Sequence, residues 1–116
     1  MDEIVNRSAV IVRPKTPYLE WCKQDDAEGL AGGVFEQMCE EPHIYLLPAY
    51  EDSESQRDVL KDYWPALFEA MLEGWVTEES LWPQERSLKM FREWFEITMT
   101  SMVLDLDLDE PLEYYE

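Results

Sequence analysis

The stretch SESQRDVLKDYWPALFEAMLEGW, residues 53–75, decides the fold, because its apolar residues recur at intervals of three and four positions. That spacing is typical of an amphipathic helix that turns one broad face toward a core. Ser53 is predicted to cap the start of this helix, with Gln56 at the reciprocal position of a capping box. Gly74 is predicted to follow its last turn.

Pro65 interrupts this helical pattern. A proline inside a helix removes one backbone hydrogen bond and clashes with the carbonyl group four residues earlier. We therefore expect either a kink near Tyr63 or two abutting helices, with Pro65 in the first turn of the second. In both cases the apolar phase predicts that Trp64 and Phe68 are buried.

One side of the same helix is acidic. At 100° per residue, five carboxylates fall within an arc of about 100°, along a segment about 28 Å long. These residues are Glu54, Asp58, Asp62, Glu69 and Glu73. Arg57 and Lys61 lie off the arc, toward the flank of the apolar stripe, where their aliphatic stems can cover hydrophobic surface. The acidic face is therefore predicted to lack local neutralisation.

Shorter patterns on either side of this helix predict further strands and helices. Runs of β-branched or alternating apolar residues favour strands, whereas prolines and glycines delimit the helices. The predicted strands cover about residues 7–13, 43–47 and 97–108, and the predicted helices cover about 17–22, 34–39 and 83–95. The last strand is predicted to fray into an acidic tail at about residues 105–116.

These elements predict a single α+β domain over residues 1–116, with a small sheet of about three strands and amphipathic helices packed on one face. The sequence is 46% hydrophobic and 13% aromatic, which is enough to form a core without disulfides. We expect a cytoplasmic protein, because the N-terminus has no secretion signal and no apolar run approaches the roughly 20 residues of a membrane span. Cys22 and Cys39 are then expected to be reduced.

The charge of the chain constrains its partners. It has 27 acidic and 9 basic residues, which give a formal net charge of −18. Self-repulsion at this charge opposes compaction. Free nucleic acid and anionic membranes would repel the protein, whereas a basic protein surface would attract it at long range. We therefore expect a basic protein partner and no direct binding to nucleic acid or membrane.

Three groups of residues resemble an uncharacterised family of small acidic bacterial proteins of unknown function. They are Val12-Arg13-Pro14-Lys15, Leu81-Trp82-Pro83 with Phe91, Trp94 and Phe95, and Ser101-Met102-Val103-Leu104-Asp105. The resemblance spans most of the chain and implies a bacterial, cytoplasmic, single-domain protein. It implies no activity, catalytic residue or cofactor.

The sequence offers few signatures of catalysis or metal binding. His43 is the only histidine and Cys22 and Cys39 are the only cysteines, and their apolar surroundings favour buried structural roles over nucleophilic catalysis. Acids between residues 105 and 116 match the spacing of a calcium-binding loop, but Glu110 stands where the loop needs a glycine. We therefore predict no catalytic residue, no metal site and no cofactor.

The sequence thus predicts a non-enzymatic acidic interaction protein. In its sharpest form, the acidic face imitates the phosphate backbone of DNA and binds a basic nucleic-acid-binding protein. The predicted partner-binding residues are Glu54, Asp58, Asp62, Glu69, Glu73, Asp105, Asp107 and Asp109. Spread uniformly, the excess charge would be about threefold more dilute than that of DNA, so mimicry requires clustering. The alternatives are a face that only keeps the protein in solution, and a small enzyme with an acidic, divalent-metal-assisted pocket.

Overall fold

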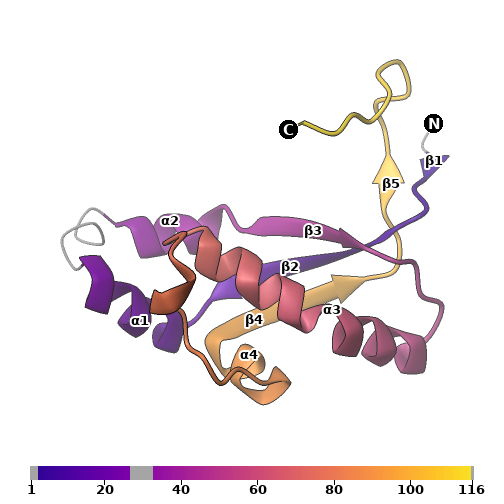
Figure 1. Cartoon of the computed structure of the whole chain (residues 1–116). Coiled ribbons are helices and arrows are strands. Elements are labelled where there is room, and N and C mark those ends of the chain that lie inside the picture. The colour runs from indigo at the N-terminus through magenta and orange to yellow at the C-terminus, as the bar shows by residue number, and fades with distance from the viewer. Residues whose placement is uncertain (1–2, 27–32, 116) are drawn as a thin grey trace.

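Figure 1 shows the structure, a computed structural model that describes residues 3–26 and 33–115. The predicted α+β class is confirmed. In chain order the elements are β1 Glu3–Ile4, β2 Ser8–Pro14, α1 Thr16–Asp26, α2 Val34–Glu40, β3 His43–Leu47, α3 Ser53–Glu73, the 3-10 turn η1 Glu79–Leu81, α4 Leu88–Trp94, β4 Phe95–Thr100 and β5 Leu104–Asp105.

The main sheet has the strand order β3-β2-β4, and both outer strands run antiparallel to β2. In its register Val10 lies opposite Tyr45 and Met99, and the next residue, Ile11, lies opposite Ile44 and Thr98. Residues that lie directly opposite in antiparallel strands share a face of the sheet. The rows through Val10 and Ile11 therefore point to opposite faces.

Helices cover one of these two faces, as predicted. On the covered face Val10 and Val12 are fully buried, together with Phe95 of β4. Helices α1, α3 and α4 all contribute buried side chains to the same core. On the other face Ile44 and Leu46 remain 62% and 48% exposed. The sheet therefore has one packed face and one open face.

Aromatic side chains fill the centre of the core. Phe68 of α3, Phe91 of α4 and Phe95 of β4 form a triangle whose ring centroids are 5.3 to 5.6 Å apart. These distances lie in the range that aromatic pairs prefer. Phe68 packs against Phe95 edge to face, with an interplanar angle of 89°. The triangle joins two helices to one edge strand of the sheet.

Helix α3 is one continuous helix with Pro65 inside it, so the alternative of two abutting helices is wrong. Its cap lies one residue earlier than predicted. Asp52, not Ser53, is the N-cap, and its carboxylate accepts a hydrogen bond of 2.8 Å from the backbone N–H of Ser55. The Ser55 hydroxyl oxygen in turn accepts from the Asp52 N–H at 3.1 Å, which completes the capping box. Both capping positions are thus displaced by one residue from the predicted pair.

The apolar side of α3 is buried along its centre and only partly buried at its margin. Phe68 is fully buried, as predicted. Trp64 is only half-buried and packs against the edge of the core, so its predicted full burial is wrong. The broad apolar stripe is wider than the surface that the sheet and α4 can cover.

The helix predicted over residues 83–95 is shorter in the structure. Helix α4 begins at Leu88, where the hydroxyl of Ser87 caps it by accepting from the backbone N–H of Met90 at 3.1 Å. Pro83 lies in an irregular segment before that cap. Phe95, predicted to end the helix, is the first residue of β4.

The strand predicted over residues 97–108 is divided. Strand β4 leaves the main sheet after Thr100, and β5 pairs instead with β1 in a separate two-stranded ribbon. Its register places Glu3 opposite Asp105 and Ile4 opposite Leu104. Figure 1 shows this ribbon projecting away from the main sheet, with both ends of the chain beside it. We call β1 and residues 102–115, which include β5, the arm.

An α-helix that spans a lipid bilayer needs about 20 predominantly apolar residues. The described part of the chain contains no such helix.

Candidate functional site

The predicted partner-binding carboxylates fall on two separate parts of the molecule. Glu54, Asp58, Asp62, Glu69 and Glu73 lie on α3 and are all exposed. Asp105 is half-buried in β5, and Asp107 and Asp109 are exposed beyond it. Because the arm projects away from the sheet that α3 covers, the structure does not join these residues into one continuous surface (Figure 1).

One carboxylate of the α3 arc has a basic neighbour. The Nη2 atom of Arg86 lies 3.2 Å from Oε1 of Glu69, so the expectation of an arc without local neutralisation is wrong at this position. Arg86 also lies over the ring of Trp82, with 5.9 Å between its guanidinium carbon and the ring centroid. The sequence pattern missed this contact because Arg86 follows Glu69 by 17 residues and lies outside α3.

The other carboxylates of the predicted set have no such neighbour. Within residues 3–26 and 33–115, no ion pair involves any of the seven that remain. Asp105 accepts a hydrogen bond of 2.9 Å from the backbone N–H of Asp107, which uses one carboxylate oxygen within the arm. Four carboxylates on α3 are therefore exposed to solvent and form no ion pair within the described residues.

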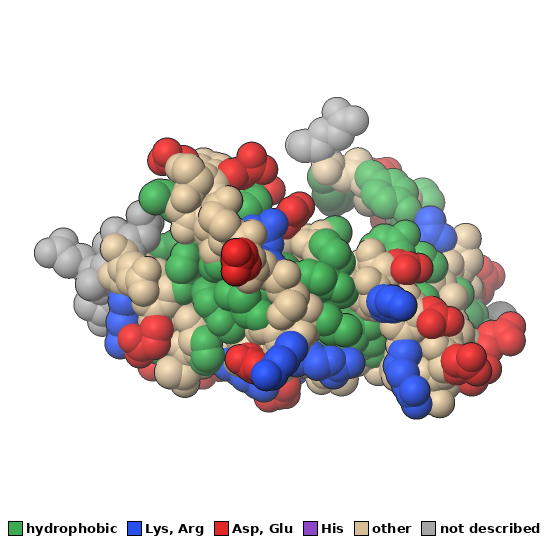
Figure 2. Space-filling model, turned by 60° about the horizontal axis from the view of Figure 1, so that its bottom comes forward, with side chains coloured by type: hydrophobic (Ala, Val, Ile, Leu, Met, Phe, Trp, Pro, Cys, Tyr) green, Lys and Arg blue, Asp and Glu red, His purple; other side chains and the backbone are tan. Residues whose placement is uncertain are grey.

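Arg57 lies toward the flank of α3, as predicted. It lines a hollow of about 130 Å³ with Arg92 of α4 and the apolar side chains of Leu60, Ile97 and Met99. Figure 2 shows Lys and Arg side chains along the lower border of an apolar area on the face that includes the bottom of Figure 1. Of the two α3 bases that flank the apolar stripe, Arg57 thus lies against α4 and β4.

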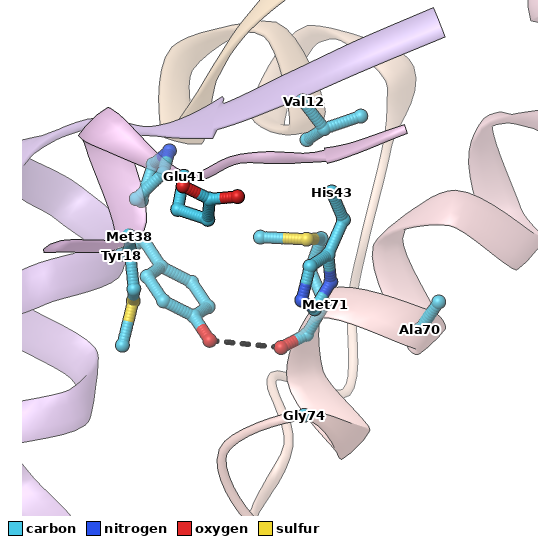
Figure 3. Close-up of a pocket in the computed structure, with 9 residues that line it drawn as sticks. Val12, Tyr18, Met38, Glu41, His43, Ala70, Met71 and Gly74 are labelled. Carbon is cyan, nitrogen blue, oxygen red and sulfur yellow. Dashed lines mark hydrogen bonds between the residues drawn. The ribbon is translucent and has the colours of Figure 1, made fainter. Parts of the chain in front are cut away.

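The best-formed concave site lies between α1, α2, the C-terminal half of α3 and the end of β2 (Figure 3). It has a volume of about 180 Å³ and is lined mainly by apolar side chains. These include Val12, Pro14, Met38 and Met71. Small-molecule sites are commonly concave and mostly apolar, with a few polar groups that fix orientation.

The polar groups of this pocket are already engaged or lie at its rim. The hydroxyl of Tyr18 donates a hydrogen bond of 2.8 Å to the backbone carbonyl of Met71 (Figure 3). Burial, followed by the nearby Cys22 thiol, raises the pKa of Tyr18 well above its usual range, which keeps this hydroxyl a donor. His43 and Glu41 line the pocket with exposed side chains, so the expected burial of His43 is wrong.

The titratable side chains among the described lining residues of this pocket are Tyr18, Glu41 and His43. Glu41 is the one carboxylate among its described lining residues. Nδ1 of His43 lies 3.4 Å from the hydroxyl of Tyr45, whose pKa is raised by burial. In the described part of the chain, no group of three or more His, Cys, Asp or Glu side chains is arranged to hold a metal ion.

The two cysteines are both thiols and are not joined by a disulfide. Cys22 is fully buried in α1, and Cys39 is half-buried in α2, where its Sγ lies 3.7 Å from the Pro14 carbonyl oxygen. Burial, followed by the charge of Glu36, raises the pKa of Cys39. A raised pKa leaves less of the reactive thiolate, so Cys39 does not have the surroundings of an activated nucleophile.

The sequence analysis missed a set of exposed leucines in the arm. The strand predicted over residues 97–108 includes Leu104, Leu106 and Leu108, which are 48%, 76% and 44% exposed in the structure. Their position in the sequence was a sign of this exposure, because these leucines follow Thr100 and the last helix of the described chain, α4, comes before β4. Comparison of the chain with protein-family models, with curated proteins and with solved structures finds no match.

Proposed function

We propose that the protein is a non-enzymatic acidic interaction protein that binds a basic nucleic-acid-binding protein. The observation that carries this proposal is the face of α3, where Glu54, Asp58, Asp62 and Glu73 are exposed and form no ion pair within the described residues. A continuous helix supports it further, because Pro65 does not divide the row. Uncompensated charge of one sign attracts a surface of the opposite sign and steers its approach.

The charge density of this face is adequate for partial mimicry of one DNA strand. Five carboxylates, one of them paired with Arg86, lie along about 28 Å of helix axis, whereas one strand of B-DNA carries about eight phosphates over that length, at 3.4 Å per phosphate. The surface as a whole is more dilute, because 8289 Å² divided by 18 excess charges is about 460 Å² per charge. The proposal therefore assigns recognition to α3 and not to the general acidity of the protein.

The test measures binding to two basic probes of similar charge. One is a small basic DNA-binding protein, and the other is cytochrome c, a basic protein that has no groove shaped for duplex DNA. We expect the DNA-binding protein to bind at least tenfold more tightly, duplex DNA to compete with the binding, and the affinity to fall steeply as salt rises. Equal affinity for the two probes would reduce the interaction to ion exchange and overturn the proposal.

A matched pair of variants locates the site. The triple variant Asp58→Lys, Asp62→Lys, Glu73→Lys reverses three exposed charges that make no ion pair within the described structure. Its control is Glu78→Lys, Glu79→Lys, Glu85→Lys, which makes the same charge change at exposed positions outside α3. We expect the first variant to lose at least tenfold more affinity than the second. Similar losses would show that net charge, and not α3, determines binding.

A further inference from the structure

Several large apolar side chains of the arm are exposed to solvent. Leu106 is 76% exposed and Ile4 is 69% exposed, and Met102, Leu104 and Leu108 are each exposed by about half. Single exposed apolar residues are ordinary, but a contiguous group of large ones marks an interaction site. The packed domain leaves these side chains uncovered, because the arm projects away from its helices (Figure 1).

The arm also has an unpaired strand edge. Strand β5 pairs only with β1 in a two-stranded ribbon, and the backbone N–H of Val5 donates to the Val103 carbonyl at 2.8 Å on the inner side. In such a ribbon the outer edge of each strand keeps free backbone donors and acceptors. Free edges of this kind accept an added strand from another chain, and side chains at alternate positions then give specificity.

The charge of the arm limits which kind of partner can bind to it. Leu104, Leu106 and Leu108 alternate with Asp105, Asp107 and Asp109 along the sequence, so each apolar side chain has a carboxylate as neighbour. A second copy of this chain carries the same net charge of −18 and repels the arm. A basic partner instead meets complementary charge at every second residue.

We infer that residues 102–108 of the arm, of which Leu104 and Asp105 form β5, dock onto a basic partner protein and act there as a docking strand. Its leucines enter an apolar groove of the partner, and its aspartates contact Lys or Arg side chains at the groove rim. The partner's own edge strand adds to the free edge of β5. This inference rests on the proposed function, because it supplies the same basic partner with an apolar anchor that the α3 face lacks.

The test uses the full-length protein and two labelled peptides. One is a ten-residue peptide of alternating Lys and Val, which presents bases and apolar groups at strand spacing. The other contains five Lys alternating with Ser, and so has the same charge without the apolar groups. We expect the Lys–Val peptide to bind at least tenfold more tightly. Equal affinity for the two peptides would overturn the inference, because the leucines would then contribute nothing.

Variants of the arm assign the contact. The triple variant Leu104→Ser, Leu106→Ser, Leu108→Ser should lose at least tenfold in affinity for the Lys–Val peptide. Leu112→Ser is the control, because Leu112 is 66% exposed and lies outside the docking strand. It should bind as the wild type does. All four positions are exposed, so we expect an unchanged melting temperature, and the triple variant is compared only after that measurement. Unchanged affinity of the folded triple variant would overturn the inference.

The result is separable from the test of α3. The charge-reversed α3 variant should still bind the Lys–Val peptide within threefold of the wild type if the arm is an independent contact. If the charge-reversed α3 variant lost peptide binding and the leucine variant kept it, the inference about the arm would be overturned. The binding site would then be α3. A light-scattering mass of a dimer that the leucine substitutions dissolve would also overturn it, since a second copy would then cover the arm.

Discussion

Strand β4 and the segment from β5 to Leu108 have the same alternation of residues in sequence and opposite surroundings. In β4, Phe95, Ile97 and Met99 face the helices, and Phe95 is fully buried. In β5 and the residues after it, Leu104 and Leu106 alternate in the same way and meet solvent. The difference lies in what covers them, because α1, α3 and α4 all pack on the main sheet. The alternation of apolar and polar residues determines which side chains share a face of a strand. Whether that face is buried depends on whether a helix packs against it.

We expect the largest effect on stability from a substitution in the packed core. Phe68→Ala removes the central ring of the aromatic triangle, and we expect it to lower the free energy of unfolding by about 3 to 5 kcal/mol. Leu106→Ala removes a side chain that is 76% exposed, and should change it by less than about 0.5 kcal/mol. Denaturant unfolding of both variants makes the comparison. A large loss on Leu106→Ala would mean that the arm folds back onto the domain.

Salt should stabilise the packed domain more than the arm. We expect the melting temperature to rise between low and moderate salt, because screening relieves repulsion among carboxylates that are close together. Asp58 and Asp62 are one helical turn apart, and a like-charged pair at this spacing costs about 0.3 kcal/mol. Asp58→Asn with Asp62→Asn should therefore reduce the salt response.

The arm supplies the control for the salt experiment. Asp107→Asn with Asp109→Asn removes the same charge from a region that is not packed, and should leave the salt response of the melting temperature close to that of the wild type. An equal reduction by both pairs would indicate that total charge sets the response. A melting temperature that falls with salt would indicate that ion pairs such as Arg86 with Glu69 dominate.

The smallest expected effect concerns the cap of α3 and its dependence on pH. Hydrogen bonds to the carboxylate from the Ser55 backbone N–H, and then from its hydroxyl, lower the pKa of Asp52. A lowered folded pKa contributes stability above the unfolded pKa of about 3.9, and this contribution is lost as pH falls through the folded pKa. Asp52→Ala should therefore lower the melting temperature at pH 7 and have a smaller effect in strong acid.

Asp58→Ala is the matched control for this pH experiment, because Asp58 lies on the same helix and caps nothing. Its effect on the melting temperature at pH 7 should be smaller than that of Asp52→Ala. If the two substitutions lowered the melting temperature equally, the capping box would not anchor α3.

The parts of the fold that depend on local chemistry were predictable from the sequence. The spacing of apolar residues placed α3, and β-branched runs between prolines placed β2 and β3. The predicted helix start at Ser53 was wrong by one residue because Asp52 and Ser53 are both good capping residues, and Ser55 selects the first. Likewise, Pro83 is a favourable helix start in isolation, but the cap at Ser87 sets the start of α4.

The candidate site was less predictable, because it depends on contacts between distant residues. The exposure of the α3 carboxylates follows from the helical phase. The pairing of Glu69 with Arg86 does not, since it requires the path of the chain after η1. The separation of Asp107 and Asp109 from α3 depends on where the chain leaves the main sheet, and the period-two pattern continues through that point without a change.

The buried thiol of Cys22 makes the stability of α1 measurable without a mutation. A reagent that alkylates cysteines can reach a fully buried Sγ only after the helix has separated from the core. The rate at which Cys22 is labelled therefore reports how often α1 opens. Cys39 is half-buried and reacts from the folded protein, at a rate limited by its raised pKa. The two labelling rates, measured on one sample, would thus compare the opening of α1 with the accessibility of Cys39 in the folded protein.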